Sequence, residues 1–138
     1  MKEEPSLPIV GVVGPCCAGK STLIRTLRAL GYPAKHIAQE HSYASQMWQI
    51  IGQPDVLIYL DVSYPVAQQR RWMNWQPADL DEQNRRLRHA REHCDLFVET
   101  DPLTVDEVRE IILKFLRGDS QLLPLRAIAS KLMGDGSG

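Results

Sequence analysis

The chain has 138 residues, of which 43% are hydrophobic and 24% are charged, and its formal net charge is −1. This size and balance fit one globular domain, and near-neutrality gives no broad electrostatic reason to expect a nucleic acid polymer or an anionic membrane as partner. No apolar run approaches the roughly 20 residues of a membrane span, and the charged start MKEEPSLP lacks the apolar core of a signal peptide. We therefore expect a cytoplasmic protein that is a monomer or a homodimer.

The first predicted elements are a strand, a glycine-rich loop and a helix. Residues Leu7 to Val13 are almost continuously apolar, which is typical of a buried parallel strand. After the loop Gly14–Ser21, an amphipathic helix carries its leucines and Ile24 on one face. Gly31 is suited to end that helix, and Pro33 prevents it from continuing.

The loop Gly14–Ser21 reads GPCCAGKS, which is G-x-x-x-x-G-K-[ST] between a strand and a helix. Such a loop turns its backbone N–H groups toward a polyphosphate, and the helix start adds unpaired N–H groups and a positive dipole end. Lys20 is then expected to reach the β- and γ-phosphates, and the Ser21 hydroxyl to bind Mg²⁺. The predicted nucleotide-binding residues are Gly14, Pro15, Cys16, Cys17, Ala18, Gly19, Lys20, Ser21 and Thr22.

The middle of the chain contains a weak and a strong strand candidate. Ala34–Glu40 is a short, weak candidate, and the apolar residues between Ser42 and Gly52 fall at helical spacing. Residues Val56–Leu60 form the clearest strand and end at Asp61, and a helix is expected from Tyr64 to about Trp72.

The remaining elements are a polar helix, a short strand and two further helices. We predict a helix over Ala78–His93 and a strand over Leu96–Glu99. Thr104 and Glu107 form a capping box for a helix that Gly118 closes. A short helix is expected over Pro124–Met133. We expect one domain over residues 1–133, with a lid at approximately 70–93, and a flexible tail over 134–138.

Alternating strands and helices predict a three-layer αβα fold with a mostly parallel sheet of about four strands. Ligands in such sheets bind at the carboxyl ends of the strands. The loop at Gly14 and the acidic residues Glu40, Asp61 and Asp101 should therefore surround one crevice.

Several nucleotide-binding classes lack their other motifs in this sequence. There is no N-K-x-D motif, which disfavours a GTPase, and no L-S-G-G-Q-like signature of a transport ATPase. Asp61 is followed by Val62 rather than by the acidic residue that motor and transport ATPases usually carry. The three cysteines form neither a disulfide framework nor a zinc cluster, and Cys16 and Cys17 are best read as tolerated loop residues.

The chain resembles the nucleoside and nucleotide kinase branch of the P-loop NTPase fold. The segment Pro54–Ser63, PDVLIYLDVS, is similar to a strand of thymidylate and deoxynucleoside kinases, and Arg70 and Arg71 stand where those families carry an arginine-rich lid. The segment Cys94–Thr104, CDLFVETDPLT, is similar to the final strand of shikimate-, gluconate- and adenylylsulfate-type kinases, where the following loop packs near the adenine. The resemblance runs from about Ile9 to Leu116.

The resemblance implies phosphoryl transfer from ATP, with Mg²⁺, to a small-molecule acceptor such as a nucleoside, a nucleotide or a similar metabolite. Only one strand fits between the first helix and the Asp61 strand, so we expect that strand directly beside the phosphate-loop strand. Glu40 then takes the position of the catalytic or metal-side carboxylate, and the metal candidates are Ser21, Glu40 and Asp61. Asp61 could equally cap the following helix.

Further roles and one rival function stay open. Arg70 and Arg71 are candidates to neutralise charge on the transferring phosphoryl group, or they form a solvated helix end. One arginine among those from Arg85 to Arg91 could also face the crevice. Tyr43, Trp48, Trp72 and Trp75 could line an acceptor pocket, although the spacing of Tyr43 also fits a core position. The rival function is a regulatory module that binds nucleotide, hydrolyses it slowly or not at all, and docks a partner through Pro124–Met133.

Overall fold

The computed structural model describes residues 7–15, 17–70 and 76–118. Four strands and five α-helices, with two short turns of other helical type, make up this part of the chain. In order they are β1 (Val10–Val13), α1 (Lys20–Ala29), β2 (Ala34–His36), the 3₁₀ turn η1 (Gln39–His41), the π-helical turn η2 (Trp48–Gly52), β3 (Val56–Asp61), α2 (Tyr64–Arg70), α3 (Pro77–Arg86), α4 (Arg88–His93), β4 (Leu96–Glu99) and α5 (Val105–Leu116).

The four strands form one parallel sheet in the order β2-β1-β3-β4. Val10 of β1 pairs with Ala34 on one side and with Val56 on the other, and Ile58 of β3 pairs with Leu96 of β4. The expected four-stranded parallel sheet is confirmed, as is the position of β2 beside β1, the strand that precedes the glycine-rich loop. All four carboxyl ends lie at one edge, where the chain leaves β1 into the Gly14–Ser21 loop.

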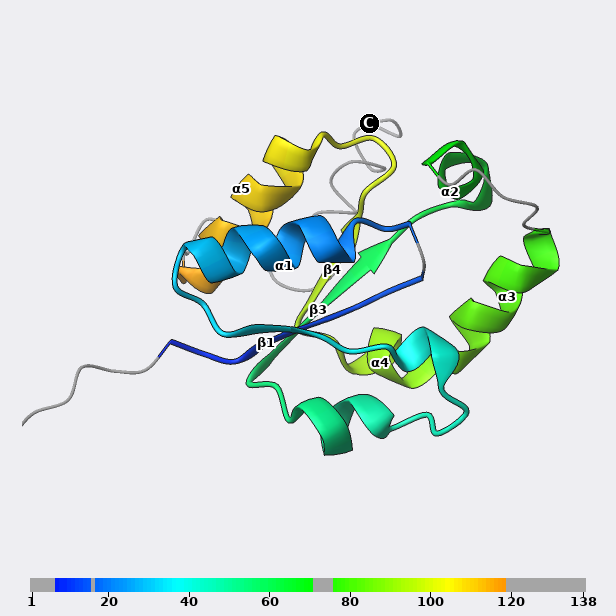
Figure 1. The fold of residues 1–138 in the computed structure, drawn as a ribbon, viewed down its shortest axis with the longest axis horizontal. Helices are drawn as coiled ribbons and strands as arrows, with labels where there is room; N and C mark the ends of the chain where they lie inside the picture. The colour runs from blue at the N-terminus through cyan, green and yellow to red at the C-terminus, as the bar shows by residue number, and fades with distance from the viewer. Residues whose placement is uncertain (1–6, 16, 71–75, 119–138) are drawn as a thin grey trace, which may run out of the picture.

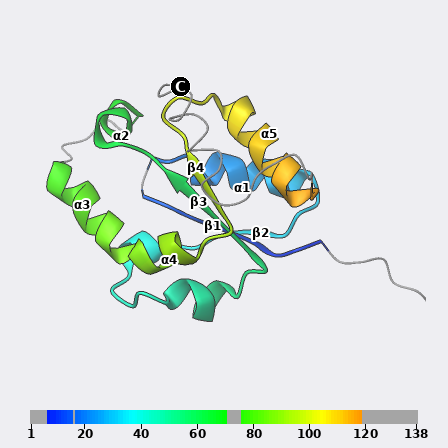
Figure 2. The ribbon, with the colours of Figure 1, turned by 180° about the vertical axis from the view of Figure 1, so that it is seen from behind.

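Helices cover both faces of the sheet, which gives three layers (Figures 1 and 2). One face, with Val12 and Leu60, packs against α1 and α5 in the larger hydrophobic cluster. The opposite face, with Tyr59 and Phe97, packs against η2 and α4 in a second cluster that includes Trp48. The alternation of side chains along each strand produces these two cores, and the fold is consistent with the three-layer P-loop architecture.

Local sequence signals determine where α1 ends and where α5 begins, as predicted. The Thr104 hydroxyl accepts a hydrogen bond from the Glu107 N–H at 3.1 Å, and the Glu107 carboxylate accepts one from the Thr104 N–H at 2.8 Å. This capping box starts α5 as predicted. Gly31 follows α1 with a φ of 96°, which a residue with a side chain rarely adopts.

Three predicted elements differ from the structure. β2 ends at His36, and Glu40 lies on η1 rather than in a strand. Only η2 is helical near the end of the segment Ser42–Gly52, and Tyr43 is 83% exposed, so its expected core position was wrong. The helix expected over Ala78–His93 is two helices, α3 and α4, which meet at Leu87.

Several predictions fall outside the described residues. These are the contributions of Cys16, Arg71, Trp72 and Trp75, the helix over Pro124–Met133 and the tail 134–138. None of the helices in the described part of the chain has the length and apolar character needed to cross a membrane.

Candidate functional site

The loop after β1 depends on glycine where it passes the end of β3. Gly14 has a φ of 149°, and a Cβ atom on it would lie 2.1 Å from the Leu60 carbonyl oxygen. Cys17 and Gly19 also have positive φ values, of 72° and 96°. These residues with positive φ values lead the backbone into α1. No side chain caps the start of α1 at Gly19. The N–H groups of the first turn of α1 are consequently available to an anion.

Lys20 lies at the centre of the site and is 7% exposed. Its ammonium donates hydrogen bonds to the carbonyl oxygens of Gly14 and Pro15, the latter at 3.1 Å. It also donates to the Glu40 carboxylate at 2.9 Å, which forms a buried ion pair. The loop carbonyls and a carboxylate from η1 thus hold the charge of Lys20 inside the protein.

Glu40 is 2% exposed and faces the loop from η1. Its Oε2 atom contacts Lys20 and lies 3.9 Å from His36 Nε2 and 3.6 Å from His41 Nε2. Its Oε1 atom is buried and has no hydrogen-bond partner within the described residues. A buried carboxylate oxygen without a partner is costly, so this oxygen is suited to a cation or to a hydroxyl donor.

A cavity of about 480 Å³ lies between the loop and Glu40. Its walls include the start of α1, with Lys20 and Ser21, and the imidazoles of His36 and His41. Burial, and then the positive charge of Lys20, lower the pKa of His36 despite the opposing effect of Glu40. This lowering favours the neutral imidazole of His36 over its cation.

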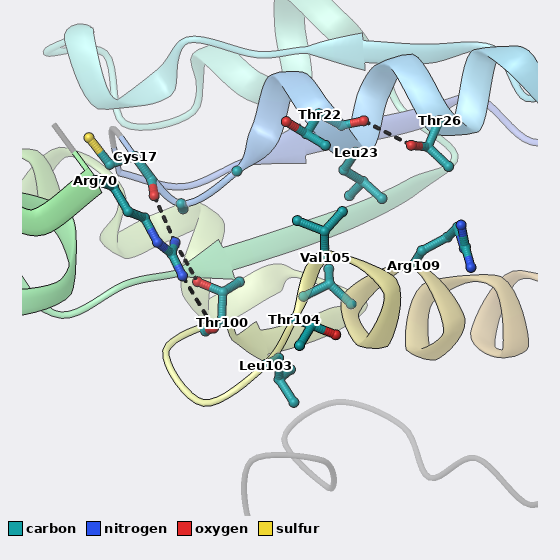
Figure 3. A pocket seen from close by; sticks show the side chains of 13 residues that line it. Cys17, Thr22, Leu23, Thr26, Arg70, Thr100, Leu103, Thr104, Val105 and Arg109 are labelled. Carbon is teal, nitrogen blue, oxygen red and sulfur yellow. Dashed lines mark hydrogen bonds between the residues drawn. The ribbon is translucent and has the colours of Figure 1, made fainter.

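A second cavity, of about 250 Å³, lies on the other side of the loop between α1 and α5 (Figure 3). Leu23 of α1 and Val105 of α5 face each other across it, and Thr100 and Leu103 come from the loop after β4. Its lining is mostly apolar by area, with polar side chains at both ends, Arg70 and Thr100 at one and Thr26 and Arg109 at the other (Figure 3). That combination is typical of a small-molecule site.

Arg70, at the end of α2, lies between the two cavities and lines both. Its guanidinium donates to the Cys17 carbonyl oxygen at 2.9 Å and to the Thr100 hydroxyl at 3.3 Å (Figure 3). Of the two arginines expected near the phosphates, the structure brings Arg70 to the loop, while Arg71 is not described.

The acidic residues after β3 and β4 do not join Glu40. Asp61 lines neither of these two cavities. Burial raises the pKa of its carboxyl above the ordinary value, although Arg91 and a hydrogen bond from the Val62 N–H act in the opposite direction. Asp101 Oδ1 accepts a hydrogen bond from the Ser63 N–H at 3.0 Å and so ties together the two loops that follow β3 and β4. The prediction that one crevice holds all three acidic residues was therefore wrong for Asp61 and Asp101. The loop and Glu40 alone of these groups line the cavity.

No specific signal in the sequence predicted the contacts of Arg86. This arginine of α3 is 19% exposed and donates to the Glu40 carbonyl oxygen at 3.2 Å and to the Tyr43 hydroxyl at 2.8 Å. Among the aromatic residues expected near an acceptor, Trp48 is instead buried and donates through Nε1 to His89 Nδ1 at 3.0 Å. Helical periodicity cannot reveal such contacts between distant segments.

A magnesium ion would need ligands from the nucleotide as well as from this chain. The described residues contain no group of three or more His, Cys, Asp or Glu side chains arranged to hold a metal. Mg²⁺ commonly takes one or two protein oxygens together with phosphates and waters. The exposed Ser21 hydroxyl and the unpartnered Glu40 Oε1 fit that pattern.

Comparison with known proteins gives one short similarity. A stretch of 27 residues is 63% identical to dephospho-CoA kinase of Rhodopirellula baltica, which covers 20% of this chain and 12% of that protein. The chain thus matches far less than two thirds of its relative's length. No family model matches the chain, and no solved structure matches it. The similarity supports a relationship to a kinase over this stretch and identifies no acceptor.

Proposed function

We propose that this chain is an ATP-dependent kinase that transfers the γ-phosphoryl group to a small-molecule acceptor such as a nucleoside, a nucleotide or a similar metabolite. The observation that supports it most is the buried Lys20–Glu40 pair beside the glycine-rich loop, with Ser21 and Glu40 lining the same cavity. The short similarity to dephospho-CoA kinase points in the same direction.

In this proposal, the two cavities divide the substrates between them. The nucleotide base occupies the apolar cavity between α1 and α5, and the triphosphate lies along the loop from Gly14 to Thr22. The acceptor enters the cavity beside Glu40, His36 and His41. Arg70 borders both cavities and so reaches the point where the two substrates meet.

Phosphoryl transfer depends mainly on positioning and on neutralising charge. When a triphosphate binds, Lys20 exchanges its loop carbonyls and Glu40 for phosphate oxygens. Glu40 then either takes the proton of the acceptor hydroxyl or helps to hold the metal ion. Arg70 neutralises charge on the transferring phosphoryl group. Bound Mg²⁺ would supply positive charge that offsets the charge of the phosphates, and the Ser21 hydroxyl, together with Glu40 in the metal-side alternative, would hold it.

An acceptor screen tests this proposal. The protein is incubated with Mg²⁺, ATP and a pool of nucleosides, nucleotides, sugars and other metabolites, and products are identified by mass spectrometry. We expect one phosphorylated product to accumulate in step with ADP. If a broad pool gives only ADP and free phosphate, the chain is a hydrolase or a regulatory module instead. Ser21→Ala, which leaves the Lys20–Glu40 contact in place, is the matched loop variant and should abolish the product.

A further inference from the structure

Arg86 connects helix α3 to the turn that carries Glu40. Its Nη1 donates to the Glu40 carbonyl oxygen at 3.2 Å, and its Nη2 donates to the Tyr43 hydroxyl at 2.8 Å. The guanidinium carbon also lies 4.3 Å from the centre of the Tyr43 ring, within the range of a cation–π contact. One side chain therefore holds two residues of this segment, one within the η1 turn and one just after it.

The contact between α3 and η1 extends beyond Arg86. Gln39 Nε2 donates to the Arg86 carbonyl oxygen at 3.3 Å, so the turn and the helix bind each other in both directions. The Gln39 side chain also accepts a hydrogen bond from the Trp48 N–H at 2.8 Å, and Gln39 is fully buried. Figure 2 shows the end of α3 beside the short η1 turn. This arrangement sets the position of η1 relative to α3.

The guanidinium of Arg86 is directed at protein atoms rather than at the cavity. Its Nε donates to Glu82 Oε2 at 3.1 Å, so each of its three nitrogens has an acceptor in the protein. Arg86 does not line the cavity beside the loop, whereas Glu40 does. Any effect of Arg86 on this cavity would therefore pass through the residues that it binds.

We propose that Arg86 is a positioning residue: by binding the Glu40 carbonyl oxygen and Tyr43, it couples α3 to the placement of the Glu40 carboxylate in the cavity. This inference rests on the proposed kinase function for its effect on turnover. Its structural part, the coupling of α3 to the η1 turn, does not depend on that function. Because a displacement of about 1 Å in a reacting group can lower a rate about 100-fold, the coupling matters for catalysis.

The test compares Arg86→Ala with Arg85→Ala. Arg85 is the adjacent residue of α3, is 68% exposed and pairs with the same Glu82 at 2.6 Å. Arg85→Ala therefore removes the same charge from α3 without removing a contact to the turn. Hydrogen–deuterium exchange of residues 37–44 reports on the turn, because the amides of Gln39, His41 and Ser42 donate hydrogen bonds to carbonyl oxygens of this segment. Steady-state kinetics with the acceptor found by the screen report on catalysis.

We expect Arg86→Ala to speed exchange in residues 37–44 and to lower kcat about 10- to 100-fold, with the KM for ATP within about twofold. Arg85→Ala should change neither. Tyr43→Phe removes only a hydroxyl from an 83% exposed ring and should give a smaller change in the same direction, which keeps the test valid if Arg86→Ala fails to fold.

Three results would overturn parts of this inference. Unchanged exchange in residues 37–44 in Arg86→Ala refutes the coupling itself. Faster exchange with unchanged kcat refutes its role in catalysis. A wild-type protein that phosphorylates no acceptor refutes the proposed function and with it the catalytic role, while the exchange measurements still decide the structural coupling.

Discussion

The buried Lys20–Glu40 pair should show strong energetic coupling. Its two charged groups are 7% and 2% exposed and 2.9 Å apart. Removing one partner of such a pair usually costs about 3–5 kcal/mol, because the other charge stays buried alone. Glu40→Gln should lie near the lower end, at about 3 kcal/mol, because Lys20 keeps the carbonyls of Gly14 and Pro15. Lys20→Met should lie near the upper end, because Glu40 Oε1 already has no partner in the described chain.

A double-mutant cycle measures this coupling. Urea unfolding of the wild type, the two single variants and Lys20→Met/Glu40→Gln gives four free energies of unfolding. The double variant buries neither charge, so its loss should fall at least about 2 kcal/mol short of the sum of the single losses. If the losses add to within about 0.5 kcal/mol, the pair is not a coupled buried interaction and the reasoning is refuted.

Two further predictions concern Arg70 and Asp61. Arg70→Ala should weaken ATP binding about tenfold without unfolding the protein, since exposed Arg70 joins the loop to Thr100. Titration of ATP into Arg70→Ala and into the exposed control variant Gln69→Ala checks this, and equal affinities would contradict it. Burial raises the pKa of Asp61, so the folded state holds the proton more tightly than the unfolded state does. The resulting stabilisation of the folded state is present at low pH and is lost as the pH rises through the folded pKa. Asp61→Asn, compared with the wild type by thermal unfolding, should therefore gain in relative stability from about pH 4 to about pH 7, and a relative loss would refute the sign.

Local patterns predicted the elements whose residues carry their own signals. The apolar run at Val10–Val13, the glycines of the loop and the Thr104–Glu107 capping box each fix the backbone through neighbouring residues. The short segment between α1 and β3 predicted a four-stranded sheet with β2 beside β1, which the pairing of Val10 with Ala34 confirms.

Tertiary contacts decided what the sequence did not predict. Between β2 and β3, the Gln39 side chain binds the Ala44 carbonyl oxygen at 2.8 Å and the Trp48 N–H at 2.8 Å. These bonds stabilise an irregular backbone where the apolar spacing predicted a helix. Tyr43 therefore lies at the surface, where Arg86 contacts its ring. The position of Glu40 near Lys20 followed from the sheet, but the hydrogen bond that the Glu40 carbonyl oxygen accepts comes from Arg86 of α3, 46 residues further along the chain.

Binding of Mg·ATP tests the central claim most directly. Isothermal titration is carried out on the wild type, Ser21→Ala and Lys35→Ala. Lys35 is an exposed residue of β2 that does not line the cavity beside the loop, so it serves as a matched surface position. Circular dichroism of each variant checks its fold. We predict that Mg²⁺ strengthens ATP binding to the wild type and to Lys35→Ala and that Ser21→Ala loses this strengthening. Equal Mg²⁺-dependent affinity in all three proteins, or no ATP binding by the wild type, would contradict the assignment of the Gly14–Ser21 loop to a nucleotide.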